Sequence, residues 1–408
     1  MTFPPPMRRT KQQQRSAGPR LDYTFITDDR ALVEWADRAG ELDWLAFDTE
    51  FIGEKRYRTL VCLIQVATED GLFLIDPIAI GDLTPFLDLV GDGDICKITH
   101  AGENDYRLLF QNYGTRPRNL VDTQLASGFL SEQYPVNFKR LADEHLGIQL
   151  KKGFAVVDWT KRPLPAGALK YALEDVAYLR DMYDVVMGKL EDRGRAAWFR
   201  AEMQTWEDVR RYEKTLLDEV KGLGAVYKMR RAEKLFTIRM VEWRRRLAEK
   251  RDHSREMVLA TKDMGAVIKL MRNGRNAITG NRHLRNKSWT KHLDAWQRLY
   301  EQPATPEEEA MLPELVAKEV TDLRQEIVGE IVYKYLTYRC LQDQIAIDLV
   351  VPRVVMRELR IGNQDALREL LDTWRREYLG DDVLDLLANT ERLEPVLEGR
   401  ALRFAEVS

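Results

Sequence analysis

An acidic pair interrupts one of the most apolar runs of the chain. Residues 44–53 read WLAFDTEFIG, and the composition around Asp48 and Glu50 predicts a buried strand. Side chains two positions apart on a strand point to the same face, about 7 Å apart along it. Two unpaired carboxylates there are costly to remove from water, and a divalent cation would remove that cost. The alternative is that one carboxylate pairs with a basic residue and the other stays near solvent.

Two further acidic positions follow later in the chain. Asp105 lies in the first turn of a helix predicted after the strand over 95–101, where an acidic residue usually interacts only with the helix dipole. Asp175 follows Tyr171 by four positions on a helix predicted over about 167–190, so the two side chains share one helix face. Taken singly, that pair indicates only a surface contact. Taken with the strand pair, the set offers hard oxygen donors, which suit Mg²⁺ or Mn²⁺.

The apolar periodicity predicts one α/β domain followed by two all-helical domains. The strands are expected over the ranges 44–51, 60–67, 72–77 and 95–101, and the first three form a β-meander. The helices of this domain are expected over 83–90, 103–113 and 167–190. From about residue 195 onward nothing alternates, which predicts helices alone. The segment YEQPATPEEE (300–309) predicts a linker between two helical modules.

Three motifs resemble those of a known nuclease family. FDTEF supplies Asp48 and Glu50, HAGENDYRLL supplies Asp105, and YALEDVAYL supplies Tyr171 and Asp175. In this order, and with LVCLIQVA, DTQLA and DWTKRPLP at the linking positions, the chain resembles the 3′–5′ exonuclease domain of the ribonuclease D family, the tyrosine-bearing branch of the DEDD exonucleases. The resemblance implies a ribonuclease-H-like α/β fold, a mixed sheet flanked by helices.

The resemblance covers about residues 40–190 and implies two divalent cations, Mg²⁺ or Mn²⁺, held by the four motif carboxylates. Two such ions about 3.5–4 Å apart can clamp an in-line displacement at phosphorus. Tyr171 would orient the attacking water, because a tyrosine of normal acidity is a poor base at neutral pH. No covalent intermediate is needed, which agrees with the lack of a convincing Ser/His/Asp or Cys/His arrangement. The loop LKKGFAVVDW (150–159) has Gly153 and Phe154 where the family pattern has a serine-bearing polar stretch, so the family's substrate contacts are not carried over to this loop.

Several polar residues near the motifs have two interpretations. Gln65, an amide in an apolar strand, either binds the terminal nucleotide of the substrate or satisfies backbone groups. Asp122 is expected to make structural hydrogen bonds, and His100 to be a satisfied strand-end residue rather than a metal ligand. Cys62 and Cys96 are expected in the core. The three cysteines of the chain lie far apart without metal-site spacing, which fits a reducing, cytosolic compartment.

Positive charge is concentrated in one segment. The formal net charge of the chain is −3, yet residues 221–300 hold 21 Lys and Arg against 7 Asp and Glu. Such a block attracts phosphate backbones, although a helical domain with a solvated basic surface is the alternative. The stretch over about 215–300 resembles an HRDC domain, the helical module shared by helicases and ribonuclease D. Trp289 could stack on a base, but burial in the helical core is favoured. The candidate substrate-binding residues are Arg244, Arg245, Arg246, Lys250, Arg272, Arg275, Arg282, Arg285 and Lys287.

The last part of the chain is acidic. Residues 301–408 hold 13 Lys and Arg against 23 Asp and Glu, so this segment is expected to bind phosphate poorly and to pack against the other domains. It faintly resembles a second HRDC-like domain. The predicted organisation is a disordered basic tail over 1–20, the exonuclease domain over 21–195, an HRDC domain over 215–300 and an HRDC-like domain over 310–390. No run reaches the roughly 18 apolar residues of a membrane span.

The resemblance predicts a cytoplasmic 3′–5′ exoribonuclease. It would trim the 3′ ends of structured RNA, such as tRNA precursors, by two-metal-ion hydrolysis and release nucleoside 5′-monophosphates. The alternatives are a 3′–5′ exonuclease acting on DNA and a non-catalytic nucleic-acid-binding protein. The HRDC-like tail and the absence of a polymerase or helicase segment favour RNA, and the complete motif set favours catalysis. Neither a membrane nor an obligate protein partner is expected.

Overall fold

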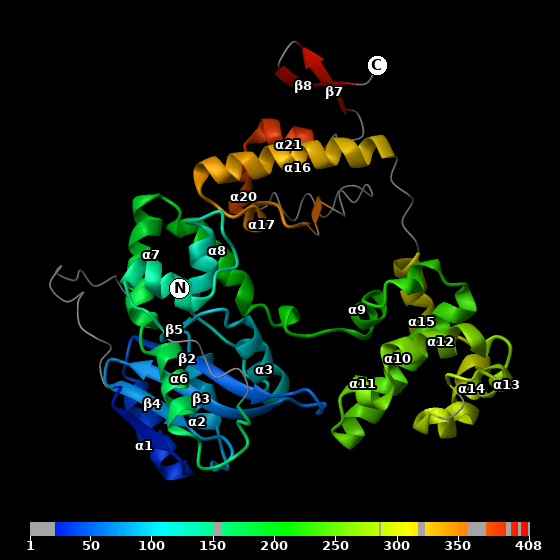
Figure 1. The fold of residues 1–408 in the computed structure, drawn as a ribbon, viewed down its shortest axis with the longest axis horizontal. Helices are drawn as coiled ribbons and strands as arrows, with labels where there is room; N and C mark the ends of the chain where they lie inside the picture. The colour runs from blue at the N-terminus through cyan, green and yellow to red at the C-terminus, as the bar shows by residue number, and fades with distance from the viewer. Residues whose placement is uncertain are drawn as a thin grey trace.

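The computed structural model describes residues 21–150, 157–284, 287–316, 323–353, 355–356, 373–388, 393–398 and 401–406. Figure 1 shows an α/β domain (residues 21–212), a first helical domain (residues 216–315) and a second helical domain (residues 323–388). The tail over 1–20, predicted to be disordered, lies outside the described residues, as does the loop segment over 151–156 that holds Gly153 and Phe154.

A six-stranded mixed sheet forms the centre of the α/β domain, in the order β1-β4-β3-β2-β5-β6. The three strands β2, β3 and β4 form the predicted antiparallel meander, while β1 pairs with β4, and β5 with β2 and β6, in parallel. Because both faces are covered, β3 is buried along almost its whole length. The strands are β1 (Tyr23–Ile26), β2 (Trp44–Ile52), β3 (Leu60–Thr68), β4 (Gly71–Ile75), β5 (Cys96–Thr99) and β6 (Leu120–Asp122).

Helices cover both faces of this sheet. On one face, α6 packs against β2 and β3 with Leu63 and Leu173 in the shared layer. On the other, Phe47 of β2 makes edge-to-face contacts with Phe86 of α2 and Tyr106 of α3. The helices are α1 (Asp29–Ala39), α2 (Thr84–Gly91), α3 (Glu103–Tyr113), α4 (Thr123–Gly128), α5 (Phe138–Leu141), α6 (Ala166–Val176), α7 (Leu179–Asp192) and α8 (Ala196–Gln204).

The single helix predicted over 167–190 is wrong. The chain leaves the helical conformation at Tyr178, whose φ of −116° and ψ of 7° separate α6 from α7. Val176 and Leu179, on either side of the break, are both buried. The apolar pattern therefore continues across the break, which is why periodicity alone indicates one helix.

The expectation that only helices follow residue 195 is also wrong. A two-stranded antiparallel hairpin, β7 (Leu393–Glu398) and β8 (Ala401–Glu406), lies near the C-terminus. The strands β1 and β6, which have four and three residues, were not expected from the sequence. Segments this short carry too few residues for a period of two to stand out.

The first helical domain closes around the core that contains Phe236, Ile268 and Trp296. The buried position of Trp289 in this core agrees with the burial favoured from the sequence. The bounds of its helices are α9 (Leu216–Lys221), α10 (Arg231–Arg251), α11 (Arg255–Val258), α12 (Thr261–Met271), α13 (Arg275–Thr279), α14 (Leu293–Glu301) and α15 (Pro306–Met311).

The segment predicted as a linker, 300–309, is part of this first helical domain. Thr305 caps α15 through a capping box with Glu308. Glu308 is buried against Arg239 of α10, with Nη2–Oε2 at 2.6 Å, and Arg239 also donates to the Leu299 carbonyl at 2.7 Å. The Pro and Glu residues that indicated a linker are instead the start of a helix.

The second helical domain packs directly on the α/β domain, in agreement with the expectation for the acidic segment. Its buried residues join the same core as Phe129 and Phe199. Trp374 lies 4.9 Å from Phe129 and stacks on Trp198 at 5.5 Å between ring centroids. Arg195 ties the two domains by donating to the Asp343 carbonyl at 2.6 Å. The helices are α16 (Leu323–Asp343), α17 (Ile347–Val350), α20 (Trp374–Leu379) and α21 (Asp381–Ala388).

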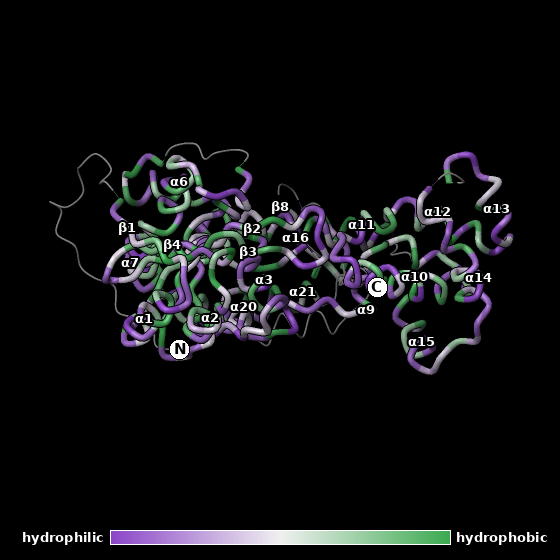
Figure 2. Tube along the Cα trace, turned by 90° about the horizontal axis from the view of Figure 1, so that it is seen from below, coloured by the Kyte–Doolittle hydropathy of each residue, from purple (hydrophilic) through white to green (hydrophobic). Residues whose placement is uncertain are grey.

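Hydropathy follows this architecture. Figure 2 shows apolar segments along β2, β3 and α6, and polar segments on the loops around α12, α13 and α15. In the described ranges, no helix combines the length and apolar character that crossing a membrane requires.

Candidate active site

Asp48 and Glu50 project from the C-terminal half of β2. In the antiparallel ladder Asp48 lies opposite Gln65 and Glu50 opposite Leu63, and the register shifts between Glu50 and Phe51. Such an irregularity bends a strand and re-aims the neighbouring side chains. Because β5 accompanies β2 only as far as Ala46, the start of α3 can approach the acidic pair from that side.

A tight turn between β5 and α3 positions Asp105. A Cβ atom on Gly102 would lie 2.5 Å from Oγ1 of Thr99, so glycine alone fits this turn. The Gly102 amide donates to Asp122 Oδ2 at 2.8 Å, and Asp122 Oδ1 accepts from the Leu125 amide at 2.9 Å to cap α4. Asp122 thus makes the structural hydrogen bonds expected of it, and Asp105 is placed in the first turn of α3.

Thr49 joins β2 to Asp105. Its buried hydroxyl donates to Asp105 Oδ1 across the two elements. Thr49 was not expected to be part of the site, because it stands between two acidic residues whose sequence signal is stronger. The alternation of side chains along β2 could have identified it. Leu45, Phe47 and Thr49 point to the same face of the strand, and Thr49 is the only one of these three with a polar side chain.

Tyr171 and Asp175 complete the cluster from α6. The Tyr171 hydroxyl donates to the Asp175 carboxylate, one helical turn away. The charge of Asp175 acts on both Asp48 and Glu50, as does the charge of Asp105. The structure therefore brings together four carboxylates and one phenol from β2, α3 and α6, which are the five residues of the three motifs.

Burial raises the pKa of every carboxyl in this cluster, and repulsion by other members of the cluster adds to the shift at Asp48 and Glu50. For Asp48 the largest cause is burial, followed by the charges of Asp105 and Asp175, and its pKa lies well above the usual range. The same causes raise the pKa of Glu50 to about 8. Burial raises the pKa of Asp175 to about 7 and that of Asp105 to about 6, where the Thr49 hydroxyl opposes the shift. Without a bound cation, the cluster therefore retains protons at neutral pH that isolated carboxyl groups would have released.

The chemistry of this donor set fits divalent metal ions. All four donors are carboxylates, the ligands that Mg²⁺ and Mn²⁺ prefer, and the charges that raise the pKa of Asp48 and Glu50 are those of other carboxylates. In the described part of the chain, no three Asp, Glu, His or Cys side chains already surround one point at ligand distances. Asp105 is held by Thr49 and Asp175 by Tyr171.

Two neighbours of the cluster differ in their hydrogen bonding. Gln65 is fully buried, and neither atom of its amide has a hydrogen-bond partner among the described residues. Its predicted contact with a nucleotide stays a prediction. His100 lies 3.0 Å from Thr123 Oγ1 through Nδ1 and donates from Nε2 to the Val136 carbonyl at 3.1 Å. Burial lowers the pKa of His100 to about 4, as expected for a satisfied, neutral histidine.

The prediction that Arg244 binds RNA is wrong. Arg244 is buried, and its Nη1 donates to the Leu259 carbonyl at 3.2 Å and to Thr261 Oγ1 at 3.0 Å. Arg244 lies on the inner face of α10, which explains why its guanidinium makes hydrogen bonds inside the domain. The next two arginines of the run differ: Arg245 is half-buried and donates to Tyr57, whereas Arg246 is exposed and pairs with Glu242.

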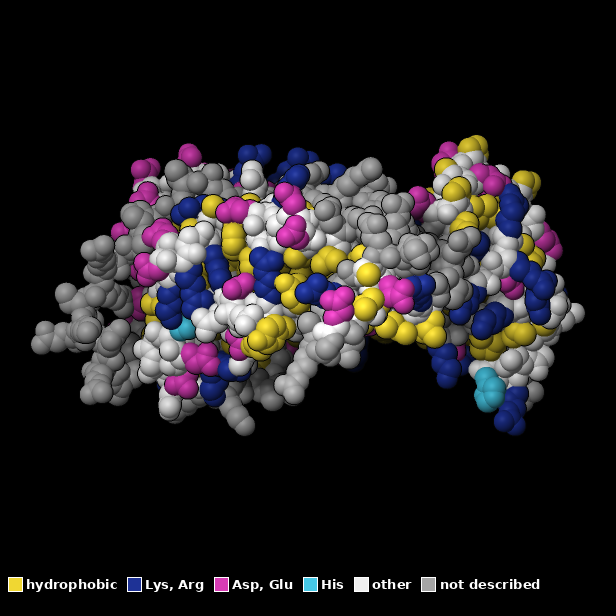
Figure 3. Space-filling view, turned by 90° about the horizontal axis from the view of Figure 1, so that it is seen from above, with side chains coloured by type: hydrophobic (Ala, Val, Ile, Leu, Met, Phe, Trp, Pro, Cys, Tyr) yellow, Lys and Arg dark blue, Asp and Glu magenta, His cyan; other side chains and the backbone are white. Residues whose placement is uncertain are grey.

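The other basic candidates lie on the surface of the first helical domain. Arg272 and Arg282 are exposed, as is Lys250. Arg275 pairs with Asp294, and Lys287 with Asp263 at 3.3 Å, although both cations remain largely exposed. Arg285 lies outside the described residues. Figure 3 shows Lys and Arg side chains over this domain, at the right of the view.

A cleft of about 960 Å³ lies between the α/β domain and the first helical domain. Tyr57 and Arg58 line it from the loop between β2 and β3, and Arg107 lines it from α3. Arg245 and Arg255 line it from the helical side. The cleft is therefore polar and rich in cations.

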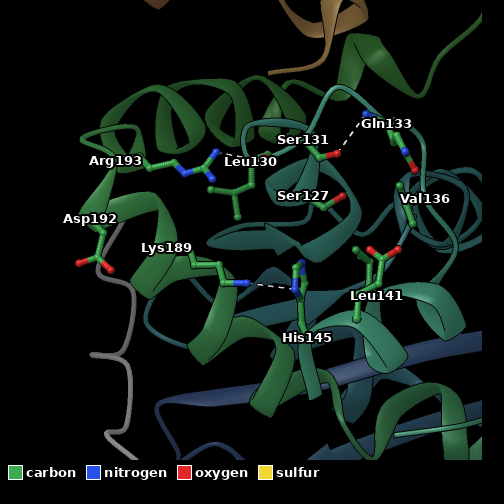
Figure 4. A pocket seen from close by; sticks show the side chains of 11 residues that line it. Ser127, Leu130, Ser131, Gln133, Val136, Leu141, His145, Lys189, Asp192 and Arg193 are labelled. Atoms are coloured by element: carbon green, nitrogen blue, oxygen red, sulfur yellow. Dashed lines mark hydrogen bonds between the residues drawn. The ribbon is translucent and has the colours of Figure 1, made fainter. Parts of the chain in front are cut away.

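A smaller cavity of about 360 Å³ lies between α4 and α7 (Figure 4). Lys189 Nζ lies 3.0 Å from His145 Nδ1, and Arg193 donates to the Leu130 carbonyl at 3.0 Å. Burial lowers the pKa of both His145 and Lys189. The motif carboxylates do not line this cavity, so it is separate from the acidic cluster.

Known proteins are similar to this chain in sequence and in fold. Residues 23–191 match the family described as 3′–5′ exonuclease. Ribonuclease D of Zymomonas mobilis is 38% identical over 192 residues, which cover 47% of this chain and 49% of that protein. The chain thus spans about half the length of that relative. Ribonuclease D of Escherichia coli is 25% identical over 376 residues, which cover 90% of this chain and 99% of that protein.

The fold comparison covers nearly the whole molecule. The crystal structure of Escherichia coli RNase D, described as an exoribonuclease involved in structured RNA processing, matches with a TM-score of 0.77 at 24% identity, over 90% of this chain and 98% of that chain. The predicted fold class, a mixed sheet flanked by helices and followed by helical domains, is confirmed. The exonuclease match over the α/β domain and the similarity along the helical domains lead to one conclusion: the α/β domain matches the 3′–5′ exonuclease family, and the chain is similar to ribonuclease D proteins over most of its length.

Proposed function

We propose that this chain trims the 3′ ends of structured RNA, tRNA precursors among them, and releases nucleoside 5′-monophosphates one at a time. The observation that carries the proposal is the meeting of Asp48, Glu50, Asp105 and Asp175 beside the Tyr171 hydroxyl. RNA as the substrate is supported by the relatives named ribonuclease D and by the exoribonuclease of matching fold.

The four carboxylates would hold two divalent cations, Mg²⁺ or Mn²⁺, in keeping with the metal dependence of DEDD exonucleases. When bound, such ions activate a water molecule and stabilise the leaving 3′ oxygen. The chain itself fixes where the ligands stand. Asp48 and Glu50 come from the paired strand β2, and Asp105 is held by the Thr49 hydroxyl, so two of the three contributing elements are already cross-linked.

Tyr171 would orient the attacking water rather than deprotonate it. Burial, followed by the charges of Asp175 and Glu50, raises the pKa of Tyr171 far above neutrality. The phenol therefore keeps its proton, which it donates to Asp175, while its oxygen can accept a hydrogen bond from water. The new bond forms between the water oxygen and phosphorus, and the bond from phosphorus to the 3′ oxygen breaks. The 3′ oxygen takes up a proton, and the released nucleotide keeps the 5′-phosphate.

The exposed cations of the first helical domain, Arg272 and Arg282 among them, would hold the RNA backbone. Arg245, Arg246, Arg275, Arg285 and Lys287 remain candidates for the same role. We place the enzyme in the cytoplasm, where three buried free cysteines are chemically stable, and we assign it no obligate protein partner.

The test is a trimming assay with three substrates labelled at the 5′ end: a 3′-extended tRNA, single-stranded RNA and single-stranded DNA. In Mg²⁺ or Mn²⁺, a ladder shortening from the 3′ end of both RNAs is expected, and it should be absent in EDTA. The variant Asp175→Asn should bind the same RNA without trimming it. Faster shortening of DNA would instead assign the chain to DNA, and retention of RNA without cleavage by the wild-type protein would make it a binding protein.

A further inference from the structure

The loop between β2 and β3 (residues 53–59) is tied firmly to the elements of the active site. A Cβ atom on Gly53 would lie 2.7 Å from Oγ1 of Thr59, so the two ends of the loop approach closely at its base. Asn112, at the end of α3, donates from Nδ2 to the Thr59 carbonyl at 2.6 Å. The loop is therefore fixed to both acidic elements, the strand that carries Asp48 and the helix that carries Asp105.

The middle of this loop enters the first helical domain. Tyr57 packs against that domain's core, and among the described members of that core it alone precedes residue 216. Arg245 of α10 donates to the Tyr57 hydroxyl, and the guanidinium carbon of Arg255 lies 5.6 Å from the centre of its ring. A tyrosine held by packing, a hydrogen bond and a cation–π contact has little freedom to move.

Polar contacts fix the rest of the loop to the end of α10. Asp252 accepts from Arg56 Nε at 2.9 Å through Oδ2 and from the Arg58 amide at 3.2 Å through Oδ1. The Ser254 amide donates to the Lys55 carbonyl at 3.0 Å. Asp252 ends α10 with a φ of 46°, a left-handed conformation in which its carboxylate meets the loop. Four consecutive loop residues, 55–58, thus contact the helical domain.

We propose that the β2–β3 loop is a latch through which the first helical domain holds Asp48 and Glu50 in their working position, with Tyr57 as the positioning residue. Glu50 lies beside the register shift of β2 and only three residues before Gly53. A displacement of the loop would therefore also displace Glu50 and Asp48, because only a few residues of a paired strand separate them from the loop. The latch makes the acidic cluster complete only while the RNA-binding domain is docked. This inference deepens the proposed function and depends on it for its activity readout alone.

The experiment compares Tyr57→Ala with Tyr57→Phe, which keeps the packed ring and loses only the hydroxyl. Two kinds of measurement are made: the kinetics, as kcat and KM, on a 5′-labelled ribodinucleotide, and the affinity for Mn²⁺ by paramagnetic resonance without any substrate. The alanine variant should lower kcat about tenfold with KM within about twofold, because misplaced catalytic groups slow the chemical step. Its Mn²⁺ affinity should fall in parallel, and the phenylalanine variant should lose less in both.

Two further variants complete the test. Tyr23→Ala removes a half-exposed tyrosine from β1, at the far edge of the same sheet, and should change none of the measured quantities. Asp252→Asn tolerates the left-handed conformation, removes one charge and should give a partial loss, even if Tyr57→Ala fails to fold. The latch is overturned if Tyr57→Ala and Asp252→Asn keep wild-type kcat and Mn²⁺ affinity, or if only the KM for long RNA rises. A wild-type protein that cleaves no RNA would defeat the proposed function, while the Mn²⁺ affinities would still decide on the latch.

Discussion

At the scale of single residues, the cost of gathering four carboxylates decides how the site responds to pH. An unfolded glutamate releases its proton near pH 4.3, whereas folded Glu50 keeps it until about pH 8. Between these values the folded state binds more protons than the unfolded state. The free energy of unfolding contributed by this group therefore falls as pH rises.

The metal-free protein should accordingly lose stability from pH 5 to pH 8, relative to Glu50→Gln, which cannot ionise at this position. The melting temperatures of both proteins in EDTA, measured across this range, test the point. Saturating Mn²⁺ should raise the wild-type melting temperature more at pH 8 than at pH 5, because protons no longer compete for the ligands. Parallel pH profiles for the two proteins would contradict the role given to Glu50.

Thr49 provides a second prediction at this scale. Thr49→Val keeps the shape of the side chain and removes the hydrogen bond to Asp105. At pH 8 the free energy of unfolding should fall by about 1.5–3 kcal/mol, the usual contribution of a hydrogen bond to a charged group. The trimming rate should fall as well, since Asp105 loses its orientation. Thr24→Val, on exposed β1, is the matched control, and equal effects from both variants would refute the assignment.

Some functional residues could be identified from sequence motifs, whereas the role of others depends on tertiary packing. Asp48, Glu50, Asp105, Tyr171 and Asp175 stand in motifs whose order and spacing resemble those of a known family, and that resemblance implied that they meet. Which cation of a basic run faces inward depends on the packing around it. Arg244 satisfies the Leu259 carbonyl inside the domain, a contact that composition cannot reveal.

At the scale of secondary-structure elements, a buried ion pair joins α10 to α15. Arg239 makes two hydrogen bonds to Glu308, both at 2.6 Å, and donates to carbonyls at the end of α14 and beyond. Arg239→Ala would leave a buried carboxylate and these carbonyls without their donor. The free energy of unfolding of the first helical domain should fall by about 3–5 kcal/mol, measured by urea denaturation with tryptophan fluorescence.

The control comes from the same helix. Arg246 pairs with Glu242 at the surface of α10, and Arg246→Ala should cost no more than about 0.5 kcal/mol. A loss below about 1 kcal/mol for Arg239→Ala would show that residues 306–311 do not fold onto α10 as described.

The secondary-structure elements that were predicted correctly share one property: each has a hydrophobic pattern that extends over enough residues to be recognised. The strands β2 and β3 and the helix α3 have continuous apolar patterns with clear ends, such as Gly114 at the left-handed end of α3. The break at Tyr178 and the folding of α15 onto α10 depend on tertiary packing. A local stretch of sequence around Tyr178 or around α15 does not include the residues against which it packs.

At the scale of the whole molecule, charge is divided between the two helical domains according to their contacts. The second domain, which is acidic, is joined to the α/β domain by a continuous apolar core. The first, which is basic, meets it through a polar cleft and the β2–β3 loop. The domain with the more limited attachment is therefore the one that would contact RNA.

Reversing two exposed charges tests this division. Arg272→Glu with Arg282→Glu, in the Asp175→Asn background that prevents cleavage, should weaken binding of single-stranded RNA. The slope of log Kd against log salt should flatten by about 0.7 for each phosphate that these arginines no longer neutralise. Arg30→Glu with Arg38→Glu, on exposed α1, should leave the slope unchanged. An unaltered slope in the first pair would remove these two arginines from the interface.

The account depends above all on the four carboxylates sharing metal ions, and a titration of the protein with Mn²⁺, followed by paramagnetic resonance, tests this most directly. The wild-type chain should bind two ions, and Asp175→Asn should lose at least one of them or bind both more than about tenfold more weakly. Wild-type protein that takes up no Mn²⁺ at millimolar concentration, or an Asp175→Asn variant that binds as the wild type does, would contradict the central claim.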